Sequence, residues 1–283
     1  MAAEKRDTVS AAQTAEQKAI AENLTRIKHK LLVISGKGGV GKSTVAVNLA
    51  YGLASLGRSV AILDTDIHGP DIPKMLGAEG QSHVAHNSNR ILPLDAHGVH
   101  AVSLASFLPD RDAPVVWRGP LKVKAIQQFL SDVEWGSLDY LVVDSPPGTG
   151  DEPLSTCQLI SHIDGSIIVT TPQEVALLDS RKCVRFSRML NVPVLGILEN
   201  MSGFVCPHCG NRVDLFKVGG GERAAKELGV PFLGRVPIDP NVVVEGDDGR
   251  PFIRDHSETE AGLALKDMVL HVIERVEPSE QHT

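Results

Sequence analysis

The glycine-rich stretch GKGGVGKST, residues 36–44, has the composition of a loop that binds phosphate groups. It fits the pattern G-x-x-x-x-G-K-[ST], follows the apolar run LLVIS and precedes a helical pattern, which is the context that this motif requires. The glycines allow backbone N–H groups to turn inward around an anion, and the N-terminus of the following helix faces the same anion. The sequence therefore predicts a nucleotide site made by Gly36, Lys37, Gly38, Gly39, Val40, Gly41, Lys42, Ser43 and Thr44.

Three residues of this loop carry side chains that can act on phosphate. We expect Lys42 to contact the β- and γ-phosphates of a nucleotide, and the Ser43 hydroxyl to bind Mg²⁺. Lys37 is an additional lysine at the second position of the motif, where a standard loop needs none. The loop therefore predicts phosphate chemistry with one cation more than usual.

Aspartates follow two further apolar runs and supply acidic groups to the same chemistry. The run VAILDTD contains Asp64 and Asp66, and the run YLVVD ends in Asp144. The carboxyl ends of parallel strands border the ligand crevice, so a carboxylate there can orient a water molecule for attack on the γ-phosphate. We expect Asp144 to act as a Walker B residue that holds Mg²⁺, usually through a water molecule. A helix cap or a surface turn is the alternative role for each aspartate.

The four cysteines fall into two kinds. Cys206 and Cys209 form a Cys-x-x-Cys pair in the stretch ENMSGFVCPHCGNR, whereas Cys157 and Cys183 lie in helical patterns and are expected to be buried and structural. Two thiolates are half of the ligand set that a zinc ion or an iron–sulfur cluster takes. His208 could add a ligand to a zinc site, although its side chain is expected to point outward. Three interpretations of this stretch remain: an iron–sulfur cluster site, a structural zinc site, or an inert pair of cysteines.

The composition of the whole chain excludes several functional classes. The net charge is -7, which argues against a broad nucleic-acid-binding face. The N-terminus has no apolar signal region, and no apolar run approaches the roughly 20 residues that span a bilayer. Four unevenly spaced cysteines in 283 residues do not resemble a disulfide framework. We therefore expect a cytoplasmic protein without nucleic-acid or membrane partners.

Strand-like and helical patterns alternate along most of the chain. The strand-like runs, such as YLVVD and GSIIVT, are apolar on both faces, which is typical of a parallel sheet covered on both sides. The pattern predicts a doubly wound, mostly parallel α/β fold with helices on both faces. The expected strands are 31–35, 59–63, 99–104, 140–143, 166–170, 194–198 and 231–236. The expected helices are 43–56, 121–133, 152–161, 175–190, 221–228 and a last one that carries Leu265 to Val276.

The same patterns divide the chain into three parts. Residues 1–29 are expected to form a partly disordered N-terminal extension with a short helix from about Thr14. Residues 30–276 would form the nucleotide-binding domain, with the Cys-x-x-Cys stretch as a loop at 199–212. Residues 277–283 form a polar tail.

Six segments, taken in order, resemble one protein family. They are GKGGVGKST, DTDIHGPDIP, VVWRGP, LDYLVVDSPPGTGD, ENMSGFVCPHCG and GRVPIDP. Together they resemble the Mrp/ApbC family of P-loop ATPases, which carry iron–sulfur clusters, over about Lys30 to Arg250. Lys37 in addition resembles the signature lysine of the deviant Walker A class, which contains the nitrogenase iron protein, MinD and ParA.

The resemblance implies roles for individual residues. A slow ATP hydrolase is implied, with Lys37, Lys42 and Asp66 as its catalytic residues. Lys37 would reach the nucleotide of a partner subunit. The implied magnesium residues are Ser43, Asp66 and Asp144, with Asp64 in support, and the implied adenine contacts are Asn200, Pro237 and Asp239.

The resemblance also implies a homodimer. Each chain would give Cys206 and Cys209 to one [4Fe–4S] cluster at the interface, and the cluster would pass to apo iron–sulfur proteins with the help of cluster assembly factors. The cofactors would be ATP, Mg²⁺ and the cluster. Many relatives carry an additional N-terminal domain or an N-terminal four-cysteine motif, and this chain has no cysteine before Cys157. Arg118 matches the family pattern without an assigned role, and the neighbouring Trp117 is expected in the core.

Two other functions remain open. One is a MinD-like or ParA-like positioning ATPase with a structural zinc clasp, although the acidic chain and the mixed charge of its last helix do not suit DNA or membrane binding. The other is a P-loop metabolic kinase, which has no use for Lys37 or for the cysteine pair.

Overall fold

The computed structural model describes residues 2–66, 69–81, 85–86, 90–107 and 119–277. The strands are β1 (Ile27–Ser35), β2 (Val60–Asp64), β3 (Ala85–His86), β4 (Arg90–Ile91), β5 (Leu94–Ala96), β6 (Val99–Ser103), β7 (Leu138–Asp144), β8 (Gly165–Thr170), β9 (Val194–Val205), β10 (Arg212–Val213) and β11 (Phe232–Ile238). The helices are α1 (Ala2–Thr25), α2 (Lys42–Ser55), α3 (Ile72–Met75), the 3₁₀ helix η1 (Leu104–Phe107), α4 (Gly119–Asp132), α5 (Asp151–Leu159), α6 (Glu174–Met189), α7 (Gly220–Leu228), α8 (Asn241–Asp247), α9 (Phe252–Asp255) and α10 (Glu260–Val276).

A nine-stranded sheet organises the described residues. Its order is β10-β9-β8-β1-β7-β2-β6-β5, and β11 pairs with β9. All neighbouring pairs are parallel except β5 with β6 and β10 with β9, which are antiparallel. The mostly parallel α/β fold expected from the sequence is confirmed.

Helices cover both faces of the sheet because its central strands are apolar on both sides. In β1, Leu31 and Val33 belong to one core, and Leu32 and Ile34 to the other. The first core is shared with α2 and α10, and the second with α1, α4, α6 and α7. Successive side chains of a strand therefore contribute in turn to two hydrophobic layers, one on each face of the sheet, as in other doubly wound sheets.

Three neighbouring strands end at one edge of this sheet and so define where the site lies. In the parallel register, Asp64 at the end of β2 pairs with Asp144 at the end of β7, and Asp144 also pairs with Val33 of β1. The loop between β1 and α2 leaves the sheet at the same edge. Ligands of doubly wound proteins bind at the carboxyl edge of the strands, and the predicted phosphate loop lies there.

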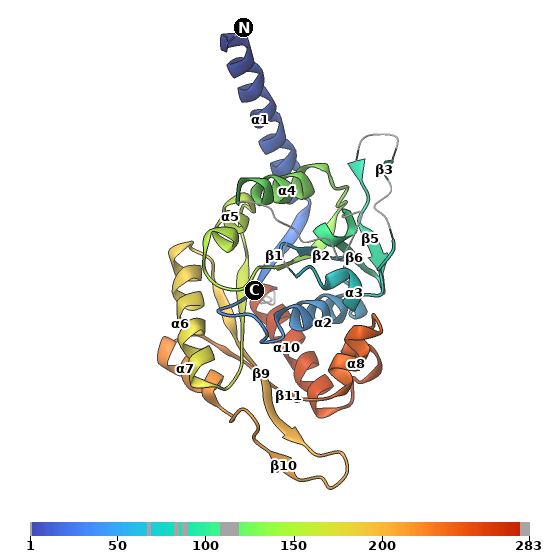
Figure 1. The fold of residues 1–283 in the computed structure, drawn as a ribbon, viewed down its shortest axis with the longest axis vertical. Helices are drawn as coiled ribbons and strands as arrows, with labels where there is room; N and C mark the ends of the chain where they lie inside the picture. Colours follow the sequence, from blue (N-terminus) through green and yellow to red (C-terminus); the bar gives the residue numbers. More distant parts are fainter. Residues whose placement is uncertain (1, 67–68, 82–84, 87–89, 108–118, 278–283) are drawn as a thin grey trace, which may run out of the picture.

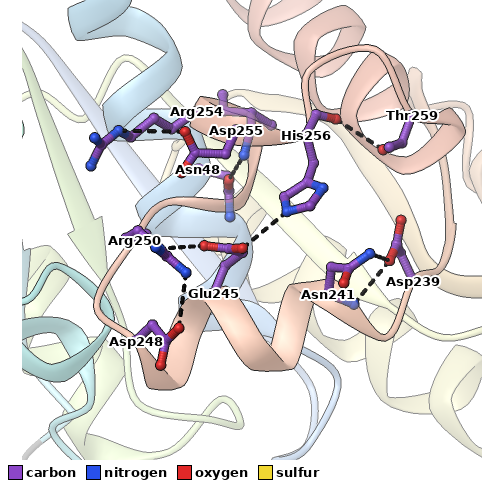
Figure 2. Close-up of polar contacts among 11 residues, drawn as sticks. Asn48, Asp239, Asn241, Glu245, Asp248, Arg250, Arg254, Asp255, His256 and Thr259 are labelled. Atoms are coloured by element: carbon purple, nitrogen blue, oxygen red, sulfur yellow. Dashed lines mark hydrogen bonds and ion pairs between the residues drawn. The ribbon is translucent and has the colours of Figure 1, made fainter.

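The segment near the C-terminus fixes the helix that follows the phosphate loop (Figure 2). The Asn48 Oδ1 atom of α2 accepts a hydrogen bond from the Ile253 N–H at 2.9 Å. Glu245 of α8 accepts from Arg250 Nε at 2.6 Å, and its carboxylate lies 3.0 Å from His256 Nε2. These contacts hold α8, α9 and the start of α10 against α2.

Two elements differ from the sequence expectation. Helix α1 begins at Ala2 instead of near Thr14, and Figure 1 shows it projecting from the body of the protein. The sequence predicts a strand that ends at Leu198, but strand β9 continues to Val205, because β10 and β11 supply hydrogen-bonding partners for its second half. The expected loop at 199–212 is therefore mostly a β-hairpin. Short elements that the sequence reading did not predict are β3, β4, β5, β10, α3, η1, α8 and α9.

No helix in the described part of the chain is long and apolar enough to cross a membrane.

Candidate functional site

The phosphate loop encloses a cavity at the carboxyl edge of the sheet. Gly39 and Gly41 have φ angles of 75° and 81°, in the left-handed region that glycine tolerates, and Gly41 is the N-cap of α2. The cavity measures about 230 Å³. The residues that line it are Ser35, Gly38, Gly39, Gly41, Lys42, Ser43, Thr44, Asp66, Gly69, Asp71, Met75 and Pro147.

Lys42, Ser43 and Asp144 form a polar triangle at the base of this cavity. Lys42 Nζ donates to Asp144 Oδ1 at 2.6 Å, and the Ser43 hydroxyl donates to Asp144 Oδ2 at 2.7 Å. The Lys42 and Asp144 side chains are only 7% and 1% exposed, so the pair lies out of solvent. Burial raises the pKa of Asp144, and the charge and hydrogen bond of Lys42 oppose that rise. The structure thus brings together the three residues that the motif assigned to phosphate and magnesium.

The donor set at this point fits a magnesium ion. Mg²⁺ binds oxygen ligands, usually one or two protein groups together with phosphate and water. The Ser43 hydroxyl and the Asp144 carboxylate are such groups, and their hydrogen bond places the two oxygens within reach of one ion. Ser43 and Asp144 are the residues that would hold it.

Asp64 and Asp66 occupy different environments although they are close in sequence. Asp64 is buried, and its carboxylate accepts hydrogen bonds from Ser103 Oγ at 2.8 Å and from the Asp66 N–H at 3.0 Å. Burial raises the pKa of Asp64 well above its usual value, and the nearby Asp144 carboxylate raises it further. Asp66 is half-buried and lines the phosphate cavity. Of the two, Asp66 is therefore the one placed to contact a ligand.

Lys37 is not among the described residues that line the cavity. Its Nζ atom is 3.4 Å from Gln173 Oε1, at the start of α6, which is a long hydrogen bond. The Lys37 carbonyl accepts from Ser35 Oγ at 2.9 Å. The side chain is half-buried, and among the described residues its ammonium group makes this one weak contact, with a neutral amide.

The predicted adenine residues divide between two places. Asn200 Nδ2 donates to the Val40 carbonyl of the phosphate loop at 2.9 Å. Pro237 and Asp239 line a separate hollow of about 340 Å³, together with Val205 and residues of α8 and α10. The two places are adjacent, because Asn200 pairs with Val236 in the parallel register of β9 and β11.

Cys206 and Cys209 lie in a hairpin that projects from the end of the sheet opposite to α1 (Figure 1). We call residues 204–213 the cysteine hairpin. Its turn is closed by the Cys206 N–H donating to the Asn211 carbonyl at 3.0 Å and by the Gly210 N–H donating to the Cys206 carbonyl at 2.9 Å. Cys206 is half-buried, while Cys209 and His208 are exposed.

The environments of the four thiols differ chemically. Backbone hydrogen bonds from Cys209 and His208 lower the pKa of Cys206, which favours the thiolate form that binds metals. Burial raises the pKa of Cys157 to about 11 and that of Cys183 to about 12. Among the described residues, no group of three or more His, Cys, Asp and Glu side chains could hold a metal ion. Cys206 and Cys209 are therefore the reactive pair and offer two ligands.

The sequence analysis did not predict several residues of the site. Ser103 holds Asp64, Gln173 contacts Lys37, and Asp71 and Met75 line the phosphate cavity. Asp71 follows Asp66 within the run DTDIHGPD, so its spacing could have suggested it. Ser103 and Gln173 are distant in sequence and carried no local signal. Trp117 and Arg118 lie outside the described residues.

Comparisons with protein families and with known proteins show which family the chain belongs to. Residues 26–273 match the family model described as NUBPL iron-transfer P-loop NTPase. The chain is 52% identical over 258 residues to the iron-sulfur cluster carrier protein of Methanocaldococcus jannaschii, and the aligned region covers 91% of this chain and 88% of that protein. It is 47% identical over 254 residues to the protein of the same name from Saccharolobus solfataricus, with 89% and 86% covered.

Solved structures of nucleotide-binding proteins have a similar fold. A nucleotide-binding protein from Archaeoglobus fulgidus in complex with ADP is 36% identical, with a TM-score of 0.75 over 87% of this chain and 95% of that one. The septum site-determining protein MinD of Pyrococcus horikoshii, complexed with Mg-ADP, is 21% identical with a TM-score of 0.65, over 87% and 96%. That second likeness shows a shared fold only. These matches confirm the resemblance read from the motifs, and the chain belongs to the ParA/NUBPL family of iron-transfer P-loop NTPases.

Proposed function

We propose that this chain is an ATP-hydrolysing carrier that holds a [4Fe–4S] cluster between two copies of itself and delivers it to apo iron–sulfur proteins. The observation that carries the proposal is the cysteine hairpin, where the Cys-x-x-Cys pair, with the thiolate of Cys206 favoured, directly follows the strand that also contacts the phosphate loop. The names of the relatives, iron-sulfur cluster carrier proteins, support the same cargo.

The cluster is the cargo, and the cysteine pair is half of its ligand set. A [4Fe–4S] cluster usually takes four thiolates, and this hairpin offers Cys206 and Cys209. Cys157 and Cys183 have raised pKa values and lie in helices, so they do not complete the site. A second copy of the hairpin supplies two further thiolates by two-fold symmetry. Exposure at the tip of a projecting hairpin suits both assembly of the shared site and release of the cluster.

Hydrolysis of ATP follows from the residues around the phosphate cavity. Lys42 exchanges Asp144 for the β- and γ-phosphate oxygens, and its charge stabilises the transferring group. Asp66, at the cavity wall, orients a water molecule for attack on the γ-phosphate, and ADP leaves. Ser43 and Asp144 would hold Mg²⁺, which neutralises the charge that develops on the phosphates. The products are ADP and inorganic phosphate.

The dimer also gives Lys37 a function. Among the described residues, its ammonium group has one hydrogen-bonding partner, the weak contact with Gln173, and Lys37 is not among the described residues that line its own cavity. In the proposed dimer it contacts the phosphates bound by the partner subunit, which makes hydrolysis depend on assembly. Asn200, Pro237 and Asp239 are proposed to receive the adenine base. The reduced thiols suit a reducing compartment such as the cytoplasm, where cluster assembly factors would be the partners.

Anaerobic reconstitution with iron and sulfide, followed by an absorption spectrum, tests the proposed cargo. A broad visible absorption band of the kind typical of [4Fe–4S] proteins supports the proposal that the chain carries a cluster. The band should be absent from a Cys206→Ala, Cys209→Ala double variant. Stoichiometric zinc and no cluster after the same treatment would instead favour a positioning ATPase with a structural zinc clasp.

A further inference from the structure

Strand β9 joins the phosphate loop to the cysteine hairpin within a few residues. Asn200 contacts the loop through its hydrogen bond to the Val40 carbonyl, at 2.9 Å. Cys206 begins the hairpin turn on the same chain segment, directly after β9 ends. Neither nucleotide binding nor cluster binding by itself requires the two sites to share a strand.

The contact between β9 and the phosphate loop is close. A Cβ atom added at Gly41 would stand 2.2 Å from Asn200 Nδ2 and 3.8 Å from Met201 Cε. Two consecutive side chains of β9 therefore lie directly over the N-cap of α2, where the N–H groups that bind phosphate begin. Asn200 and Met201 are therefore the β9 side chains that lie next to Gly41 of the loop.

The segment between this contact and the hairpin is bent. Met201 has a φ angle of 56°, which is uncommon for a residue with a side chain, and Gly203 has a φ angle of 80°. In the pairing with β11, Asn200 lies opposite Val236 and Phe204 lies opposite Ile238, so four residues of β9 span two of β11. Such a bulge bends a strand and leaves part of it outside the regular ladder.

Glu199 anchors β9 on the other side of the contact. Its side chain is fully buried, and its carboxylate accepts hydrogen bonds from Ser202 Oγ at 2.5 Å and from the Gly219 N–H at 2.8 Å. It also accepts from the Gly221 N–H, in the first turn of α7. A carboxylate that caps a helix N-terminus is held by both hydrogen bonds and the helix dipole. If the Asn200 side chain moves, the residue before it in the chain, Glu199, is held in place. The segment after it, Met201–Gly203, is bent and less regularly hydrogen-bonded, so movement is easier in that direction.

We infer that β9 is a coupling element, in which Asn200 exchanges the Val40 carbonyl for a bound nucleotide and the Met201–Gly203 bend passes that change to Cys206 and Cys209. Glu199 is a positioning residue that directs the movement toward the hairpin. This inference rests on the proposed function for its biological meaning, since it makes nucleotide occupancy regulate the cluster site. Its two states are the two hydrogen-bonding partners of the Asn200 amide, which is the kind of element that coupling between sites requires.

The test measures how fast iodoacetamide alkylates each cysteine of the full-length, reduced, cluster-free protein, with and without saturating Mg·ADP. Peptide mass spectrometry reports each site, and the buried Cys183 serves as an internal reference. ADP avoids turnover during the measurement. Analytical ultracentrifugation selects a protein concentration at which the oligomeric state is the same with and without nucleotide.

Wild-type protein is expected to change its alkylation rate at the cysteine pair by about fivefold or more on binding ADP, the lower end of typical coupling between sites. Asn200→Ala, measured at ADP concentrations that calorimetry shows to be saturating, is expected to lose that change. Met201→Gly, which fits the φ angle and loosens the bend, is expected to reduce that change when it is likewise measured at saturating ADP. Glu199→Gln should reduce the response, whereas the matched control Glu227→Gln, an exposed residue of α7 paired with Arg181, should not.

A wild-type rate that ADP leaves unchanged overturns the inference, and so does a full response in both Asn200→Ala and Met201→Gly. Reconstitution separates this inference from the proposed cargo. A protein that takes up no cluster but shows the response, lost in the variants, contradicts the cargo and supports the coupling. A protein that takes up a cluster but shows no response contradicts the coupling alone.

Discussion

Lys42 and Asp144, which are 102 residues apart in the chain, form an ion pair inside the protein, with 2.6 Å between Lys42 Nζ and Asp144 Oδ1. Each is a residue that the motifs assign to a ligand, Lys42 to phosphate and Asp144 to magnesium. The pair therefore compensates two buried charges with each other, and a magnesium–nucleotide complex offers both of them a replacement partner.

Removing the lysine should affect both hydrolysis and stability. Lys42→Ala is expected to lower ATP turnover by roughly 10²–10³-fold or more, because it removes the cation at the β- and γ-phosphates. It should also destabilise the fold by about 3–5 kcal/mol, because Asp144 is left buried without its charged partner. Steady-state ATPase assays and thermal unfolding measure the two effects.

The pH dependence of that loss has a definite sign. Burial raises the pKa of Asp144, and without Lys42 the two largest influences that oppose the rise, its charge and its hydrogen bond, are lost. A carboxyl with a raised pKa in the folded state binds a proton on folding, so the stability of Lys42→Ala should increase as the pH falls from about 7 to about 5. Adding Asp144→Asn should restore part of the stability and none of the turnover. A single variant as stable as wild type at neutral pH would contradict the buried-pair account.

The second lysine should matter for turnover and not for binding or stability. Lys37→Ala is expected to reduce hydrolysis by roughly tenfold or more, because the cation it contributes acts on the partner's nucleotide. Its only described partner is the weak contact with Gln173, so the melting temperature and the affinity for ADP should stay close to wild type. Turnover equal to wild type would exclude the action of Lys37 across the dimer.

Asp66 and Asp64 offer a matched pair of substitutions. Asp66→Asn is expected to bind Mg·ATP and to hydrolyse it roughly 10²-fold more slowly, because the water is no longer oriented by a carboxylate. Asp64→Asn, at a buried position that holds the Asp66 backbone, should instead change stability as well as turnover. Calorimetry with a non-hydrolysable ATP analogue separates binding from turnover. Loss of binding in Asp66→Asn would make that residue structural.

The sequence predicted most of the sheet because its central strands are apolar runs with clear ends. Strands β2, β7 and β8 lie within a residue or two of the expected ranges, and Asp64 and Asp144 end their strands as expected. The phosphate loop was equally visible, because its glycines and lysines are fixed in spacing. These features depend on local sequence, so a single chain is sufficient to reveal them.

Features that depend on distant partners were not visible in the sequence. The continuation of β9 past Asn200 needs β10 and β11, and positive φ angles at Met201 and Gly203 absorb the additional residues. The buried partner of Asp64 is Ser103, and nothing local indicated it. Helix α1 extends through a polar, alanine-rich segment that we expected to be disordered, since its composition alone favours neither state clearly.

The thiols should differ sharply in reactivity. Cys206 should react with iodoacetamide at neutral pH, and its rate should reach half-maximum at a lower pH than that of glutathione, because backbone hydrogen bonds lower its pKa. Cys183, which is buried as expected and has its pKa raised to about 12, should react slowly until the protein unfolds. Cys157 is half-buried and not fully buried as expected, and its pKa, raised by burial to about 11, should make it react more slowly than Cys206. Rapid labelling of Cys183 in the folded protein would contradict the assignment of structural and ligating cysteines.

Cluster stoichiometry on size-separated protein tests the shared site most directly. After anaerobic reconstitution, the dimer fraction of the wild-type protein should contain about four irons and four sulfides, the composition of one [4Fe–4S] cluster. Cys206→Ala and Cys209→Ala should each lose the cluster and keep much of their ATP hydrolysis, while Cys157→Ala and Cys183→Ala should keep it. A cluster on the monomer fraction, or one retained by the Cys206→Ala, Cys209→Ala double variant, would show that the two chains do not share it.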